Sequence, residues 1–403
     1  MTEDVEGASL KLLAYCQAND WAGYDPYDAL NSELFAALPF LQWNLPRIVL
    51  TQILKNSPIN LRSLVLVPKT QNPKALALFL SGLLNLSKAG PVGQGDLIEQ
   101  IIGRLIVLRS PGIPYWGWGY SFPWQTRNML VPAGAANLVC TTFVASALLD
   151  AYEERRDSRC LEMAVSAAEY ILNELYWTDG NTVSCFSYPQ PGVRSKTHNA
   201  NLLSAALLCR VCKCTGEQKF LDPALRVARY SAGKQRADGS WAYGELPSQQ
   251  WIDNFHTGYN LWALHSLGRY LETAEFDSCV RKGFGFYRAY FFREDGSVRY
   301  FHDRDYPVDI HSVAQSIITL LVLRDFDAEN VARAHLIFRW AMNHMWDDRG
   351  FFYYRVLRLA TIRTSYMRWS QAWMFLALSM LLSESTAPTA GLHDQNPALS
   401  RAS

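Results

Sequence analysis

The amino-acid sequence predicts an all-α fold, an (α/α)6 toroid in which six helical hairpins close into a barrel. Three observations lead to this prediction: a repeated helix start, an alternation of apolar with amphipathic helices, and a short aromatic strand pair after each amphipathic helix. The helix start repeats as an amide residue beside an apolar run, at Asn201, Asn260, Gln315 and Gln371, which are 59, 55 and 56 residues apart. A fixed period of this kind indicates repeated units within one closed architecture.

The first 110 residues hold the least regular helices, in "LPRIVLTQIL", "PKALALFLSGLLNL" and "GDLIEQIIGRLIVL". One period back from Asn201 lies Thr142 in "LVCTTFVASALLDAY", so five clear repeats fill residues 117–384. We therefore expect a single domain over residues 1–384, with irregular first hairpins over 1–110, and a disordered tail over 385–403. An open helical solenoid is the main alternative, but its repeats are usually shorter and lack a strand insertion.

Inner and outer helices differ in pattern. The runs "NANLLSAALL", "TGYNLWALHSL", "VAQSIITLLVL" and "RWSQAWMFLAL" are apolar on nearly every side, which indicates burial on both faces. The helices that follow them, such as "LDPALRVARYSAGKQ", are amphipathic and suit an outer position. Each outer helix leads into a turn and aromatic residues typical of strands, as in "TDGNTVSCFSYPQ", "ADGSWAYGE", "EDGSVRYFHDRDYP" and "DDRGFFYYRVLR".

Composition excludes several classes of function. The formal net charge of +1 gives no electrostatic reason to expect a nucleic-acid partner. No stretch approaches the roughly 20 apolar residues of a membrane-spanning helix, and the acidic, polar start has no signal-peptide pattern, so we expect a cytoplasmic protein. Of the eight cysteines only Cys209, Cys212 and Cys214 cluster, without a second ligand pair, and we expect neither a metal nor a cofactor.

A toroid brings the loops before its inner helices together at one end, so polar residues distant in sequence are expected to surround one cavity. Aromatic faces, carboxylates, amides and arginines in one cleft are what sugar recognition needs. The residues that we expect to bind substrate are Arg127, His198, Asn201, Trp251, Tyr259, Tyr300, Arg304, Gln315, Tyr354, Arg355 and Arg368, and Asn199 is expected near them.

Two helix starts match each other closely. His256-Thr257-Gly258-Tyr259-Asn260 and His311-Ser312-Val313-Ala314-Gln315 share a histidine, a hydroxyl, a small residue and an amide, and Asp253 and Asp309 precede them. The aspartates suit helix capping as well as chemistry. Imidazoles just inside buried helices need a partner or a wet cavity.

Glu245 and Tyr243 follow a predicted strand and alternate on one face, at the rim of the cavity. The catalytic candidates are therefore Tyr243, Glu245, Asp253, His256, Asp309 and His311.

The segment "GELPSQQWIDNFHTGYNLWALHSL" resembles the Glu-x-Pro segment and following helix start of glucuronyl C5-epimerases, and "WDDRGFFYYR" is similar to their later hairpin. The resemblance implies an α/α-toroid catalytic domain whose tyrosines and glutamate exchange the C5 proton of a uronate in a polymer. It does not explain His256 or His311, and the family's N-terminal β-rich region is missing.

Two further resemblances concern the fold. "WAGYDPYDALNSELF" and the Phe-His-Thr-Gly helix start resemble toroid proteins encoded among bacterial exopolysaccharide and capsule genes. "QRADGSW" resembles the Gln-Trp repeat of terpene cyclases, but neither "HDRDYP" nor "RDFDAEN" supplies the Asp-x-Asp-Asp acid of such an enzyme, so a cyclase is disfavoured.

The leading hypothesis is an enzyme of surface-polysaccharide assembly that acts on a uronate-containing glycan or lipid-linked oligosaccharide, as an epimerase or lyase. In this hypothesis Arg304 or Arg355 neutralises the carboxylate, Glu245 or His256 is the base, and Tyr243 or Tyr300 donates a proton. A glycoside hydrolase that uses Glu245 or Asp253 with Asp309 is one alternative. A non-catalytic glycan-binding or scaffold subunit in contact with the synthesis machinery is the other.

Overall fold

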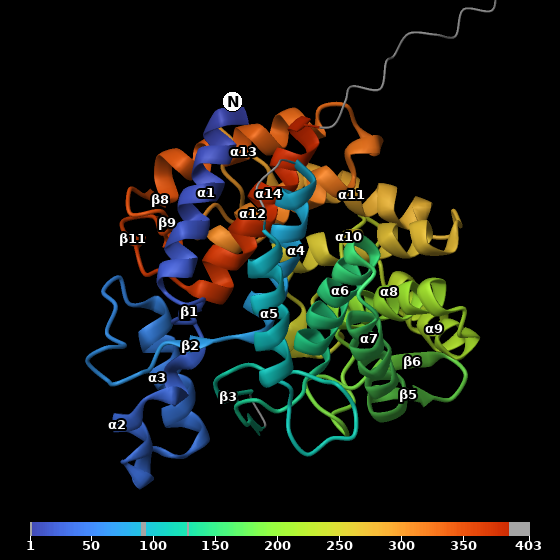
Figure 1. The fold of residues 1–403 in the computed structure, drawn as a ribbon, viewed down its shortest axis with the longest axis horizontal. Coiled ribbons are helices and arrows are strands. Elements are labelled where there is room, and N and C mark those ends of the chain that lie inside the picture. Colours follow the sequence, from blue (N-terminus) through green and yellow to red (C-terminus); the bar gives the residue numbers. More distant parts are fainter. Residues whose placement is uncertain (1, 90–93, 127–128, 387–403) are drawn as a thin grey trace, which may run out of the picture.

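The computed structural model describes residues 2–89, 94–126 and 129–386 (Figure 1). Within these ranges, six helices form an inner ring in which each contacts the next and the last contacts the first. The inner helices are α4 (Pro73–Ala89), α6 (Leu138–Arg155), α8 (His198–Thr215), α10 (Asn254–Leu271), α12 (Ile310–Val322) and α14 (Ala372–Thr386). The predicted (α/α)6 toroid is thereby confirmed.

Each inner helix carries an outer helix on its far side. The outer helices are α5 (Gly95–Val107), α7 (Ser158–Tyr170), α9 (Leu221–Ala232), α11 (Asp277–Phe291) and α13 (Asn330–Met345), each packed on the inner helix before it, and α1 (Thr2–Ala18), packed on α14. The helix α1, near the start of the chain, thus completes the outer ring by packing on α14, which sequence periodicity did not indicate. The predicted tail of residues 385–403 lies, from residue 387 onward, outside the described residues.

Burial explains the two helix patterns. Every residue of α12 from Ile310 to Leu321 is buried, as expected for a helix with neighbours on all sides. On α9 the buried residues Ala224, Val227, Ala228 and Ser231 recur at helical spacing and leave a polar outer stripe. No helix in the described ranges is long and apolar enough to cross a membrane.

The predicted strand pairs form small antiparallel sheets at the end of the ring where the inner helices begin. The strands are β3 (Trp124–Gln125) with β4 (Leu130–Val131), β5 (Tyr176–Asp179) with β6 (Val183–Phe186), and β8 (Trp346–Asp347) with β9 (Phe351–Phe352). A three-stranded sheet has β10 (Arg355–Val356) between β7 (Val308–Asp309) and β11 (Thr361–Ile362).

The segments "ADGSWAYGE" and "EDGSVRYF" form tight turns with isolated bridges instead of strand pairs. Gly239 and Gly296 have φ angles of 94° and 89° in these turns, a conformation that favours glycine. A Cβ atom at Gly239 would also clash with the carbonyl oxygen of Lys282 on the next outer helix. The Asp-Gly steps are therefore fixed by packing as well as by turn geometry.

The repeated amides brace two of the hairpins. Asn201 Oδ1 accepts a hydrogen bond of 3.0 Å from the Phe186 backbone N–H. Gln371 accepts from the Phe352 N–H at 2.9 Å and donates to the Phe352 carbonyl at 2.8 Å. Gln315 has a different role: its amide donates to Thr319 Oγ1 at 3.0 Å.

One excursion of the chain stands outside the two helical rings (Figure 1). Strands β1 (Ala22–Gly23) and β2 (Thr70–Gln71) pair at its base and enclose α2 (Glu33–Ala36) and α3 (Asn44–Asn56). Its interior holds the buried ion pair between Arg62 Nε and Asp28 Oδ1, 2.7 Å apart.

We predict that Gln371→Met lowers the free energy of unfolding by about 1–3 kcal/mol, because it leaves the buried Phe352 N–H and carbonyl without their partner. Chemical denaturation measures the change. The control is Gln218→Met at an exposed amide, where a change of no more than about 0.5 kcal/mol is expected. Equal changes at the two positions would contradict the bracing role.

Candidate active site

The first residues of the inner helices surround a cavity of about 320 Å³, which we call the N-terminal cavity. Most of its lining side chains are aromatic, and polar groups lie among them. Eight of the predicted site residues line it: Tyr243, Trp251, Asp253, His256, Tyr259, Tyr300, His311 and Arg368. Asn199 lies in the same wall.

Asp253 caps α10 and holds the imidazole of His256. Its Oδ1 accepts a hydrogen bond of 2.9 Å from the His256 backbone N–H, and its Oδ2 lies 2.7 Å from His256 Nδ1. Trp251 Nε1 donates to the same Oδ2 at 3.1 Å. A carboxylate at Nδ1 keeps the ring proton on that nitrogen, which leaves Nε2 as the basic one. The Asp253 side chain therefore both caps helix α10 and positions the His256 imidazole.

His311 is buried and uncharged. Its Nε2 lies 2.6 Å from the Tyr259 hydroxyl, and its ring stacks against Phe255 and Trp373 with centroids 4.5 and 4.6 Å away. Burial lowers the pKa of His311 well below its usual value, and the nearby Lys74 and Arg368 lower it further. The two imidazoles lie beside the same ring, since the Phe255 centroid is also 4.1 Å from that of His256.

Two basic side chains, Lys74 and Arg368, line the cavity. Arg368 is bound by both oxygens of Asp25, at 2.6 and 2.8 Å. Lys74 is 3% exposed, and its Nζ lies 4.0 Å from the centroid of the Phe143 ring. No described acidic side chain forms an ion pair with Lys74. Burial lowers its pKa well below the usual value, and Arg368 adds to the effect.

Sequence reasoning missed Lys74 and Asp25. The available signal was weak: Lys74 is the single charged residue in the apolar run "PKALALFLSGLLNL", at the start of an inner helix.

Aromatic side chains form the outer part of the cavity. Tyr243 stacks on Trp251 with centroids 4.6 Å apart and an interplanar angle of 13°, and Trp251 is partly exposed. Tyr120 stacks on Phe122 at 5.6 Å. Flat aromatic rings in a cavity wall suit contact with the apolar face of a sugar ring.

Glu245 lies outside this cavity. Its carboxylate accepts from the Tyr230 hydroxyl and lies 3.6 and 3.7 Å from Lys196 and Lys234. Burial raises the pKa of Glu245, but Tyr230 and the two lysines outweigh it, so the net shift is downward. The segment after Glu245 forms a short 3₁₀ helix, Pro247–Gln249.

Asp309 and Arg355 form a fully paired cluster behind the cavity. Asp309 Oδ2 accepts from Arg355 Nε at 2.5 Å, and its Oδ1 accepts from Trp369 Nε1 and the His311 backbone N–H, both at 2.9 Å. The carboxylate therefore fixes the start of α12 and the strand β10.

The other predicted residues serve packing or lie at the surface. His198 Nδ1 faces Ser231 Oγ at 3.5 Å, and burial lowers the pKa of this histidine to about 4. Arg304 pairs with Asp303 on the surface. The remaining predicted residues outside the cavity wall are Asn201, Gln315 and Tyr354. Arg127 lies outside the described residues.

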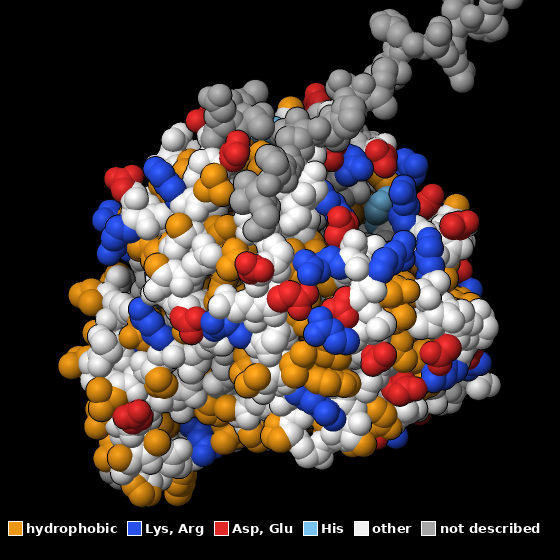
Figure 2. Space-filling view, viewed as in Figure 1, with side chains coloured by type: hydrophobic (Ala, Val, Ile, Leu, Met, Phe, Trp, Pro, Cys, Tyr) orange, Lys and Arg blue, Asp and Glu red, His pale blue; other side chains and the backbone are white. Residues whose placement is uncertain are grey.

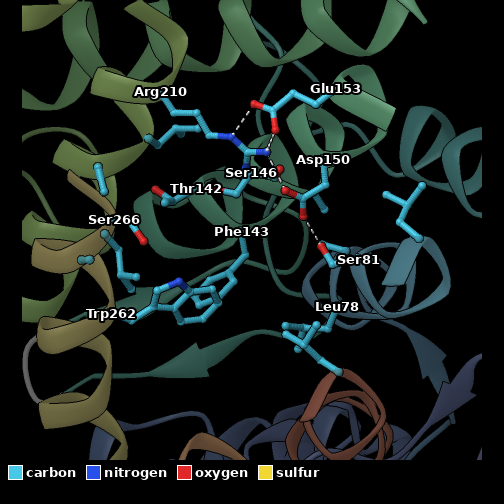
Figure 3. Close-up of a pocket in the computed structure, with 18 of the residues that line it drawn as sticks. Leu78, Ser81, Thr142, Phe143, Ser146, Asp150, Glu153, Arg210, Trp262 and Ser266 are labelled. Carbon is cyan, nitrogen blue, oxygen red and sulfur yellow. Dashed lines mark hydrogen bonds and ion pairs between the residues drawn. The ribbon is translucent and has the colours of Figure 1, made fainter. Parts of the chain in front are cut away.

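A second cavity of about 340 Å³ lies further along the same inner helices and is called the C-terminal cavity (Figure 3). Arg210 donates to Glu153 at 2.8 Å and to Asp150 at 2.7 Å, and Ser81 donates to Asp150 at 2.6 Å. Phe143 packs between the two cavities, against Tyr259 and Trp373. The charged groups labelled in Figure 3 bind one another.

Neither a family model nor a curated protein sequence matches the chain. Solved structures do match. A family 76 glycoside hydrolase, an α-mannanase from Bacteroides thetaiotaomicron, is similar with a TM-score of 0.61 and 13% identity over 78% of this chain and 87% of that one. Cellobiose 2-epimerase from Bacillus thermoamylovorans is similar with a TM-score of 0.60 and 12% identity, over 79% of this chain and 90% of that one. A D-mannose isomerase is similar with a TM-score of 0.59 and 13% identity, over 78% of this chain and 87% of that one.

The chain shares their fold. At these identities the likeness concerns the α/α-toroid architecture alone.

We predict that His311 is still neutral at pH 6.5, the usual pKa of histidine, because burial and the nearby Lys74 and Arg368 lower the pKa of its imidazole. The ¹⁵N chemical shifts of its ring measure this directly. Shifts typical of imidazolium at pH 6.5 or above would contradict the predicted environment.

We predict that Asp309→Ala lowers the free energy of unfolding by about 3–5 kcal/mol, because Arg355 then stays buried without a counter-charge. Asp303→Ala removes the exposed partner of Arg304 and serves as the control, with a change of about 0–1 kcal/mol. Denaturant titration separates the two outcomes. A change at Asp309 as small as that at Asp303 would show that the cluster is not a structural anchor.

Proposed function

We propose that this chain is a carbohydrate-active enzyme that removes and returns a proton on a sugar carbon, as an epimerase or isomerase does. The observation that carries the proposal is that two polar pairs, Asp253–His256 and Tyr259–His311, line one aromatic cavity. The solved structures of similar fold include a cellobiose 2-epimerase and a D-mannose isomerase, which supports this reaction class.

The two pairs suit opposite roles in proton transfer. His256 Nε2 is the base, because Asp253 holds the proton on Nδ1 and stabilises the imidazolium that forms. Tyr259 is the acid: burial raises its pKa well above 10, so the hydroxyl keeps its proton until the reaction. With its proton on Nε2, His311 donates to the Tyr259 oxygen and stabilises the tyrosinate. The proton taken by His256 returns to Tyr259 through solvent at the end of the cycle.

We propose a uronate as the substrate, because Lys74 is buried and has no acidic partner among the described residues. A bound carboxylate would compensate its charge, and the N-termini of the inner helices add a favourable potential at the same place. With the carboxylate neutralised, the C5 proton becomes removable: its electron pair moves into the carboxylate as His256 takes the proton. Lys74 replaces Arg304 and Arg355 in this role, since both arginines pair with aspartates outside the cavity wall.

Hydrolysis by paired carboxylates has less support. Among the described lining residues, Asp253 is the one carboxylate, while Glu245 and Asp309 are bound elsewhere. Elimination differs from epimerisation only in the loss of a leaving group after C5 deprotonation, so a lyase remains within the proposal. A role in polysaccharide assembly, and contact with its machinery, stay predictions.

Incubation in heavy water tests the reaction. The probes are D-mannose, cellobiose, D-glucuronate and glucuronate-containing oligosaccharides. We expect deuterium on carbon, at C5 of the uronate, without chain cleavage, detected by NMR. Unsaturated ends would identify a lyase. New reducing ends without carbon-bound deuterium would identify a hydrolase and contradict the proposal, and binding without any product would favour a glycan-binding subunit.

We predict that His256→Gln and Tyr259→Phe each lower the exchange rate about 10²- to 10⁴-fold, because each removes one proton-transfer group. Glu245→Gln and Tyr354→Phe are the matched controls, since neither side chain lines the cavity. Both controls should retain exchange within about threefold of the unchanged protein. Loss of exchange in Glu245→Gln with native stability would instead place the base at Glu245.

A further inference from the structure

An apolar face covers the chain excursion that carries α3. It consists of Trp43, Leu45, Val49, Ile53, Ile59 and Leu64, each among the exposed large hydrophobic side chains. Trp43 is 76% exposed and Leu64 is 74% exposed. Figure 2 shows hydrophobic side chains gathered at the lower left, over the place where Figure 1 labels α2 and α3. Monomeric proteins rarely expose apolar surface so densely without a partner.

The exposed apolar residues of α3 are different from those that pack into its core. On α3, Leu54 is buried and Leu50 packs beside it, in a small core with Ala29 and Val67. Leu45, Val49 and Ile53 recur at every fourth position on the same helix and are exposed. The helix therefore has one apolar stripe for its own core and a second apolar stripe that faces solvent.

Basic side chains predominate around the face, although the exposed Glu33 on α2 is acidic. The sequence contains no Asp or Glu between Leu34 and Gly95. Arg47, Lys55 and Lys69 lie on or beside the excursion, and none of them forms an ion pair with a described acidic residue. Exposed Leu, Val, Ile and Trp side chains with basic neighbours are typical of helices that lie in a lipid–water interface.

We propose that the apolar face docks on a membrane surface that contains anionic lipids. Leu45, Val49, Ile53 and Trp43 insert among the lipid headgroups, and Arg47 and Lys69 lie against the lipid phosphates. A second copy of this chain fits less well, because a symmetric contact would bring the basic residues of the two copies together.

The face also lies near the N-terminal cavity. Helix α3 contacts β3, which contributes Trp124 to the cavity wall. Lys55 Nζ donates to the hydroxyl of Tyr27, another lining residue, at 2.7 Å. Docking through α3 therefore holds this side of the cavity close to the lipid surface.

Sedimentation with lipid vesicles tests the proposal on the full chain. The vesicles are phosphatidylcholine alone and phosphatidylcholine mixed with phosphatidylglycerol. We expect partition onto the mixed vesicles, weaker partition onto phosphatidylcholine, and weaker binding at high salt. Leu45→Gln/Val49→Gln/Ile53→Gln should lower partition at least about tenfold. Arg47→Gln/Lys69→Gln should lower it about fivefold per charge on mixed vesicles only.

The control variant is Leu10→Gln/Val107→Gln/Leu359→Gln, which changes the same number of exposed apolar side chains elsewhere. It should partition as the unchanged protein does, and thermal melting checks that every variant is folded. Three results would overturn the proposal: no binding to mixed vesicles, unchanged binding by the α3 variant, or self-association that the α3 variant abolishes in the absence of vesicle binding.

Discussion

The parallel start of the inner helices at one end of the ring is the constraint on which the rest of the structure depends. Each start leaves backbone N–H groups without a helical partner, and polar side chains must satisfy them. Asn137, Asp253 and Asp309 do so at α6, α10 and α12. The fold thereby gathers carboxylates, imidazoles and helix N-termini around one cavity before any chemistry is required of them.

The same constraint gives the two capping aspartates, Asp253 and Asp309, different roles. Asp253 caps its helix with one oxygen and holds His256 with the other, inside the cavity wall. Asp309 caps in a similar way, but Arg355 and Trp369 use its remaining hydrogen-bonding capacity. Two similar helix starts thus give one side chain that remains available for chemistry and one that anchors a strand.

Sequence periodicity predicted the ring and its inner and outer helices, and eight of the predicted site residues line the cavity, because burial and helix starts leave local patterns. It did not predict which way each histidine points. His198, His311 and His256 are the first, second and third residues of their helices, and each step rotates a side chain by about 100°. His198 consequently faces Ser231 on an outer helix, while His256 and His311 line the cavity.

Other features depend on contacts between distant segments. The pairing of α1 with α14 joins segments more than 350 residues apart in the sequence and has no periodic signal. Lys74 and Asp25 meet Arg368 only because the ring closes. The exposed apolar stripe of α3 looks in sequence like an ordinary helix, since its small core and its solvent face are both hydrophobic.

A crystal structure of the protein with D-glucuronate bound tests the central claim most directly. We expect the sugar in the N-terminal cavity, with its carboxylate within hydrogen-bond distance of Lys74 Nζ and its C5 between His256 Nε2 and the Tyr259 hydroxyl. Glucuronate bound in the C-terminal cavity, or with its carboxylate on Arg304 at the surface, would contradict it.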